Sequence, residues 1–303
     1  MLSSAEVDLA RRDPAIPGLA VVLDPDALAA ALRRAAPQAD LGTAQITYVR
    51  YKPAAYCRVT YRLEVAGGAL DLDVRACRPD DLASWRDAGE AVGVSGPLGP
   101  GRIVLEHCAV LATVFPNDLK LVALHHLTDA VERSQVLREL LPDRPDLWRG
   151  ELRCLRYRPE RRYVAELRAA DGARALLKSY TARAYTRGLR NARAFRSRGP
   201  LRIAELLGSS DSLRLLAFEW LPGRLLMDLC AAPDINGAAV SAAGAALAEL
   251  HAQDPGGDGL DCWTREAEAA DLVTVASELG CICPGLAGRA GELARRQIGR
   301  AHV

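Results

Sequence analysis

The stretch LRYRPERRYVAELRA, residues 155–169, decides the fold, because it passes from a Leu-Arg-Tyr-Arg-Pro phrase into alternating polar and apolar residues. Such alternation is typical of β-strands, and a proline ends strand pairing. The stretch VRYKPAAYCRVTYRLEV, residues 49–65, opens with a closely similar phrase. Each phrase heads three predicted strands and a predicted helix, so we expect a structural duplication. The alternative is that Arg-Tyr-basic-Pro is simply a good strand end that occurs twice.

Working outward from these phrases, the pattern predicts two similar series of elements. The first series has strands at 46–51, 57–65 and 69–76, a helix at 79–92, and strands at 102–107 and 109–115. The second has strands at 152–157, 162–169 and 174–180, a helix at 182–199, and strands at 202–208 and 213–221. Gly67-Gly68 and Asp171-Gly172 predict hairpins. Further helices are expected after a loose start, at 27–36, 118–127, 129–141, 235–253, 264–279 and 285–297, and residues 222–230 are expected to be a turn that leads into a short helix.

Length and composition indicate an ordinary globular protein. A chain of 303 residues is long for one core and predicts about two domains or lobes. The net charge of +1 favours no particular partner. No apolar run resembles a signal peptide or a membrane span, and the eight scattered cysteines are typical of free thiols, so we expect a cytoplasmic protein without a membrane partner.

The predicted fold class is therefore α+β, with several segments. We expect an N-terminal helical segment at 1–45, a lobe-like α+β domain at 46–145, a second α+β lobe at 146–222, and a helical segment at 223–297. The proline-broken link PDRPD at 142–146 is the expected boundary between the lobes.

Three motifs of the second half resemble one known family. They are ALLKSY at 175–180, LLAFEWLPGRLL at 215–226 and AGAALAELH at 243–251. Together they resemble the small lobe, and the start of the large lobe, of the protein-kinase-like fold used by aminoglycoside and choline phosphotransferases. The resemblance covers about a third of the chain and implies ATP and Mg²⁺ as cofactors.

The resemblance assigns roles to particular residues. Lys178 would meet the ATP phosphates, while the backbone around Glu219, Trp220 and Leu221 would bind the adenine edge. The glycine-free turn at 156–162 would take the place of the phosphate-covering loop, with Arg158, Arg161 and Arg162 acting as charges. The alternatives are a solvated strand lysine, a tryptophan that only packs, and solvated arginines.

The chain departs from the family pattern in two ways. The helix at 182–197 has no Glu to pair with Lys178, and Glu205 lies just beyond it. No His-x-Asp occurs anywhere, so we expect neither a catalytic residue nor a metal ligand within this chain. We expect residues 298–303 to be a non-native tail, because a back-translation of QIGRAHV matches a common sequencing-library adapter. The chain would then be an inactive fragment that lacks the catalytic loop.

The function expected of the intact protein is ATP-dependent phosphoryl transfer to a hydroxyl of a small polar molecule, such as an aminoglycoside, a choline-like amine or a sugar. The alternative is a non-catalytic kinase-like module that binds a nucleotide or a partner protein. We do not expect a nucleic-acid partner, because charge runs are usually solvated helix faces. The run in question is Arg183, Arg187, Arg190, Arg193, Arg196, Arg198 and Arg202. His125, His126 and His251 are expected to be ordinary helix residues.

Overall fold

The computed structural model describes residues 1–65, 68–87, 93–96, 98–99, 101–230, 237–254 and 264–300, with the side chains of 86–87 and 298–300 excepted. The chain divides into two compact units. The first unit is Met1–Leu119 with Cys262–Val303, and the second unit is Lys120–Asp261. Gly67 of the predicted first hairpin, residues 88–92 of the predicted helix, and 301–303 lie outside the described residues.

The second unit is built on a five-stranded antiparallel sheet of order β6-β7-β8-β10-β9. The predicted strands are confirmed, and β9 begins a few residues later than expected because Ser197 Oγ, rather than a strand, bonds the backbone of Ile203. Helix α7, Ala182–Ala194, joins β8 to β9. The strands are β6 Glu151–Arg158, β7 Arg162–Arg168, β8 Arg174–Tyr180, β9 Leu206–Ser210 and β10 Leu215–Glu219.

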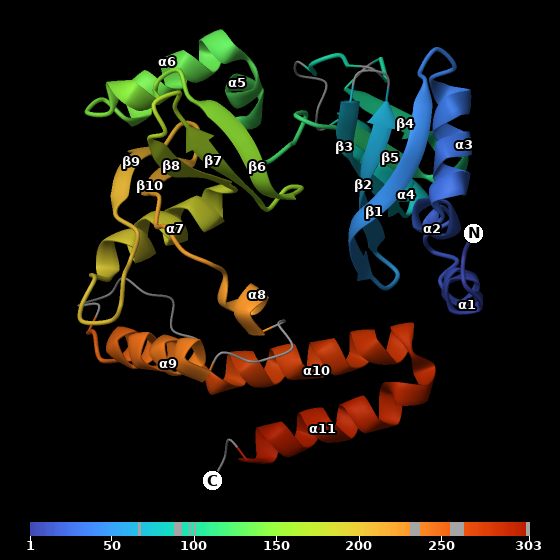
Figure 1. The fold of residues 1–303 in the computed structure, drawn as a ribbon. Helices are drawn as coiled ribbons and strands as arrows, with labels where there is room; N and C mark the ends of the chain where they lie inside the picture. The colour runs from blue at the N-terminus through green and yellow to red at the C-terminus, as the bar shows by residue number, and fades with distance from the viewer. Residues whose placement is uncertain are drawn as a thin grey trace. The chain divides into compact units, whose positions relative to one another are not determined.

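Alternation along β8 gives the second sheet two faces (Figure 1). Ala175 and Leu177 are buried in the core under α5 (Leu124–Thr128) and α6 (Ala130–Leu140). Leu176 and Tyr180 instead pack toward α7, with Phe218 of β10. Because side chains two residues apart share a face, Lys178 lies on the α7 face.

The division between the units differs from the boundary expected at 142–146. Helix α6 belongs to the second unit, since its residues Leu137 and Leu140 share a core with β8 and β10. The proline-broken link is a 3-10 turn at Pro145–Leu147 inside that unit, and Trp148 Nε1 donates to Leu141 O at 2.8 Å. The composition of 142–146 correctly predicts a turn. The residues before and after this turn pack together, so it lies inside one unit.

The first unit repeats the same sheet, with order β1-β2-β3-β5-β4. Its predicted strands are confirmed, and the Asp24 side chain caps the start of α3. The expected loose start is wrong, because Ser3 and Glu6 form a capping box that begins α1. The elements are α1 Ser4–Arg12, α2 Leu19–Leu23, α3 Pro25–Ala35, β1 Leu41–Lys52, β2 Tyr56–Val65, β3 Gly68–Cys77, α4 Pro79–Asp87, β4 Arg102–Leu105 and β5 Val110–Val114.

The predicted structural duplication is confirmed by strand order and by backbone geometry. In both units a helix follows the third strand, and the five strands pair in the same order. The described residues include four non-glycine residues with positive φ, and they occupy equivalent places. Ala54 and Glu160 lie in the turn after the first strand, while Ala109 and Arg214 immediately precede the last strand.

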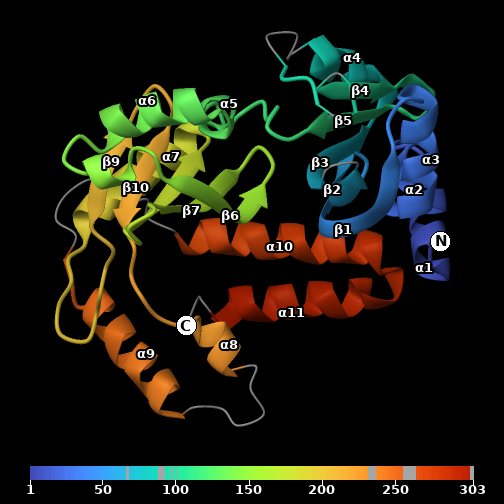
Figure 2. The ribbon, with the colours of Figure 1, turned by 45° about the horizontal axis from the view of Figure 1, so that its top comes forward.

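Most of the remaining chain is helical, as predicted. The helices are α8 Leu226–Cys230, α9 Gly237–His251, α10 Arg265–Ile282 and α11 Ala287–Arg300. Helices α10 and α11 form an antiparallel pair (Figures 1 and 2). In the first unit, Arg12 donates to the last carbonyls of α10, at Cys281 and Ile282. Within the described parts of these four helices only Ala294 is buried, so the two sheets carry the cores.

None of the described helices combines the length and the apolar character that a membrane crossing requires. The seven described cysteines are free thiols, as expected.

A candidate anion-binding site in the second unit

Lys178 lies at the centre of the second sheet. Its strand neighbours are Val164 on β7 and Leu216 on β10. The side chain is half-buried on the α7 face, and Nζ lies 4.6 Å from the centroid of the Phe218 ring. A ring face attracts a cation, so Phe218 holds the ammonium in place without neutralising its charge.

No carboxylate among the described residues forms an ion pair with Lys178. Helix α7, which faces it, contains no acidic residue. Burial lowers the pKa of Lys178 below its usual value, and the neighbouring Arg162 lowers it further. A buried ammonium without a counter-ion is costly, and a bound anion would remove that cost.

A pocket of about 420 Å³ lies between the β6–β7 turn and α7. We call it the arginine pocket. It is lined by Arg158, Arg161, Arg162, Tyr180, Ala184, Arg187, Gly188 and Asn191. Four guanidinium groups and no carboxylate line it, so its field is positive. Guanidinium groups match the geometry of phosphate oxygens and bind them in pairs of hydrogen bonds.

Arg162 connects Lys178 to the arginine pocket. It lies opposite Tyr180 in the β7–β8 ladder, on the same face as Lys178. Its Nε is buried, and no described group accepts a hydrogen bond from it. Such a donor is expensive to leave unsatisfied. An anion in the pocket would satisfy this donor, whereas Lys178 itself is not among the residues that line the pocket.

The β6–β7 turn keeps its shape without a glycine. Glu160 takes the left-handed conformation at φ 52, and Arg161 N donates to Arg158 O at 3.0 Å. The Glu160 carboxylate forms an ion pair with Lys120 at 3.0 Å, so it does not place a negative charge in the pocket. Arginine side chains of this turn line the pocket.

The predicted adenine-binding segment lies elsewhere on the unit. Glu219 ends β10, and its backbone N–H donates to Glu205 O at 2.8 Å. That N–H is therefore engaged within the protein. Trp220 and Leu221 follow the strand and are half-buried, and the Arg174 guanidinium lies 5.6 Å from the Trp220 ring centroid.

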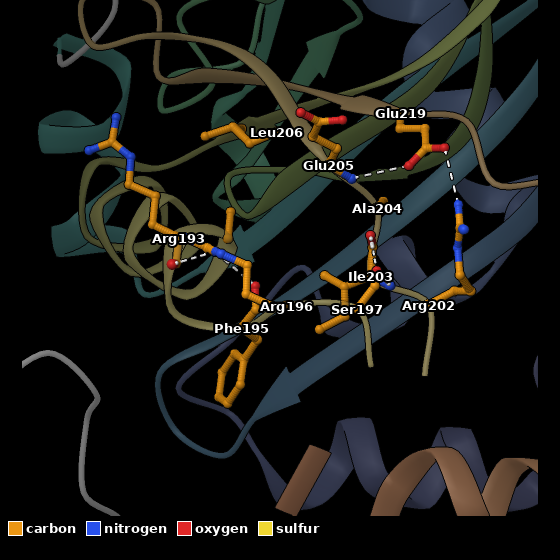
Figure 3. Close-up of a pocket in the computed structure, with 11 residues that line it drawn as sticks. Arg193, Phe195, Arg196, Ser197, Arg202, Ile203, Ala204, Glu205, Leu206 and Glu219 are labelled. Atoms are coloured by element: carbon orange, nitrogen blue, oxygen red, sulfur yellow. Dashed lines mark hydrogen bonds and ion pairs between the residues drawn. The ribbon is translucent and has the colours of Figure 1, made fainter. Parts of the chain in front are cut away.

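Glu219 lines a second and larger pocket, of about 730 Å³ (Figure 3). Glu205 N donates to the Glu219 carboxylate at 3.4 Å, and Arg202 approaches the same carboxylate at 3.6 Å. Arg196 donates to the carbonyls of Arg193 and Phe195. This pocket carries two carboxylates, those of Glu205 and Glu219, so it suits an anion less well than the arginine pocket.

The structure brings Arg158 and Arg162 together in the arginine pocket, with Lys178 on the same face of the sheet but outside the pocket lining, and it leaves Glu219 to Leu221 apart from that pocket. Sequence reasoning did not assign Gly188 and Asn191 to the site, and it placed Arg187 only in a solvated charge run. The signal for them is the helical period, because Ala184, Arg187, Gly188 and Asn191 share one face of α7.

His126 and His251 both lie on helices, as predicted. His126 has an acidic partner that was not expected, because its Nδ1 lies 2.9 Å from a carboxylate oxygen of Glu132, one helix further on. His251 is exposed at the end of α9.

No protein-family model, no curated protein and no solved structure matches this chain. The phosphotransferase resemblance therefore stays a prediction.

Proposed function

We propose that the second unit binds ATP through its phosphates, and that the intact protein is an ATP-dependent phosphotransferase acting on a hydroxyl of a small polar molecule. One observation carries the proposal: Lys178 is a half-buried cation with no described carboxylate partner, and it lies beside a pocket lined by four arginines.

The chemistry of the site favours a polyphosphate over a single carboxylate. A carboxylate offers two oxygens, whereas the triphosphate of ATP carries several negative charges along a chain. Lys178, Arg162 and Arg158 would each meet a different part of such a chain. The volume of about 420 Å³ lies in the range of small-molecule sites.

Magnesium does not fit the described site. Mg²⁺ is held in proteins by carboxylate oxygens and water. The lining of the arginine pocket offers no carboxylate, and the nearby Glu160 is paired with Lys120. The positive side chains themselves neutralise the phosphates in this proposal, and no step is assigned to a metal.

The sequence contains no His-x-Asp pair. We therefore expect this chain to bind ATP without transferring its phosphoryl group, and the acceptor class (aminoglycoside, choline-like amine or sugar) is carried by the resemblance alone. The alternative function is a non-catalytic nucleotide-binding module. The absence of any acid from α7 favours it, because the kinase-like arrangement would pair Lys178 with a Glu on that helix.

The proposal is tested by comparing the affinities of adenosine, AMP, ADP and ATP for the chain by calorimetry. We expect affinity to rise with each added phosphate and adenosine to bind weakly or not at all. Equal binding of adenosine and ATP would exclude a phosphate site. Transfer of labelled γ-phosphate to a panel of hydroxyl acceptors, by this chain or a longer form of the protein, separates the enzyme from the non-catalytic module.

A further inference from the structure

The duplication allows the site of the second unit to be compared with its counterpart in the first. Arg58 lies opposite Arg75 in the β2–β3 ladder, as Val164 lies opposite Lys178 in the β7–β8 ladder. Arg75 pairs with Leu111 in turn, as Lys178 pairs with Leu216. Arg75 is therefore the counterpart of Lys178.

Two further positions follow from the same registers. Tyr56 pairs with Cys77 at one end of the ladder, where Arg162 pairs with Tyr180, so Tyr56 is the counterpart of Arg162. The backbone N–H groups of Cys77 and Tyr180 also make equivalent bonds, both of 3.1 Å, to the residue before the last strand.

Helices α4 and α7 both begin two residues after these strand ends, at Pro79 and Ala182. Counting along each helix from its first residue places Trp85 of α4 at the position of Gly188 of α7.

In the first unit these three positions contact one another. The Arg75 guanidinium carbon lies 3.8 Å from the centroid of the Trp85 ring, which is a close cation–π contact. It lies 5.7 Å from the centroid of Tyr56, and the two rings are 6.2 Å apart. An aromatic pair thus covers the cation at the place where the second unit has its pocket.

In the second unit the same positions hold Arg162, Lys178 and Gly188. Two of them are cations, and the third has no side chain. A Cβ built on Gly188 would lie 3.4 Å from Leu216 Cδ1 and 3.5 Å from Tyr180 Cε2, which is ordinary contact distance. A small side chain therefore fits between the helix and the sheet. A large one, extended as Trp85 is in the first unit, would reach toward the positions of Arg162 and Lys178 at the arginine pocket, which Gly188 lines.

We propose that Gly188 keeps the arginine pocket open to polyphosphate, and that the first unit is a copy of the same fold whose pocket is filled by its own Trp85 and Tyr56. The chain then binds one polyphosphate, in the second unit. This inference rests on the proposed function, which supplies the ligand.

The experiment gives the second unit the residue of the first. We would titrate the whole chain with ATP, and separately with inorganic triphosphate, for the wild type and for Gly188→Trp, Gly188→Ala and Trp85→Leu. Gly188→Trp is expected to weaken binding of both ligands about tenfold or more, as loss of a single charge-assisted contact would. Gly188→Ala, whose methyl group reaches only Leu216 and Tyr180, is expected to lose less affinity than Gly188→Trp. Trp85→Leu, in the first unit, is expected to bind like the wild type, at one ligand per chain.

The outcomes separate the two proposals. If Gly188→Trp binds ATP like the wild type, the role of Gly188 is wrong and the proposed function stands. If the wild type binds triphosphate but not ATP, and Gly188→Trp no longer binds triphosphate, the role of Gly188 stands and the proposed function is wrong. If the wild type binds neither, or binds two per chain, the inference falls. Should Gly188→Trp fail to fold by circular dichroism, Gly188→Leu fills the same space with a better helix former and is judged by the same criteria.

Discussion

Lys178 is a residue whose buried charge lowers the stability of the fold but can attract an anionic ligand. Its neighbours Leu176 and Tyr180 pack against α7, so the ammonium is drawn out of water with them. The only described contacts that act on its charge are the Phe218 ring and the repulsive Arg162. A residue of this kind is expected where a ligand, rather than the fold, supplies the counter-charge.

Replacing Lys178 with Met is expected to leave the free energy of unfolding at pH 7 unchanged or higher. Met has a similar length and avoids the desolvation of an unpaired charge. Urea unfolding of both proteins measures this. A clear loss of stability in Lys178→Met would mean that the ammonium has a stabilising partner.

The same variant has a predicted pH signature. Because the folded pKa of Lys178 is lowered, the unfolded chain binds its proton between that pKa and about 10.4, while the folded chain does not. The stability of the wild type relative to Lys178→Met should therefore rise with pH through this window. A difference that stays constant or falls up to pH 10 would contradict the lowered pKa.

At the scale of elements, the sequence predicted the strands well and the boundaries less well. Alternating residues on a half-buried sheet, such as 174–180, have a period that local sequence alone reveals. The capping box of Ser3 and Glu6 was equally local and was overlooked. The domain boundary was not local, because only the packing of α6 against the second sheet decides to which unit 120–145 belongs.

The candidate site was predictable only in part, for the same reason. Lys178 and the arginines of the β6–β7 turn follow from a motif and a charge count. Gly188 and Asn191 need the knowledge that α7 presents one face to that turn. The equivalence of Gly188 and Trp85 needs the strand registers of both units, which no single stretch of sequence contains.

The packing of α6 on β9 depends on Gly208. A Cβ on this residue would lie only 1.9 Å from the backbone oxygen of Leu140. Gly208→Ala must therefore push α6 away from the sheet, and we expect a loss of roughly 3 kcal/mol in the stability of the second unit. Gly244→Ala, at an exposed position of α9 with open space around it, controls for the loss of a glycine alone. Equal stability of Gly208→Ala and the wild type, measured by urea unfolding, would show that α6 does not pack there.

At the scale of the whole molecule, the chain carries two separate hydrophobic cores on two similar sheets. Each has its own covering helices and its own β-hairpin turns. In the first unit Trp85 and Tyr56 contact Arg75, whereas the second unit leaves the equivalent Lys178 beside an open pocket.

Two cores predict that ATP stabilises only one part of the molecule. Saturating ATP, at about a hundred times its dissociation constant, should stabilise the second unit by about 2.7 kcal/mol and leave the first unit unchanged. Calorimetric melting should therefore show one transition that moves with ATP and one that does not, and Gly208→Ala should lower the moving one. A single transition that ATP shifts as a whole would contradict this independence.

The most direct test of the account is an ATP titration of the chain by isothermal calorimetry, with wild type and Lys178→Met side by side. The account predicts one ATP per chain in the wild type, bound with or without Mg²⁺, and binding weakened about tenfold or more in Lys178→Met. Absence of ATP binding in the wild type, or the same affinity in both proteins, would contradict the claim that Lys178 and the arginine pocket form a phosphate site.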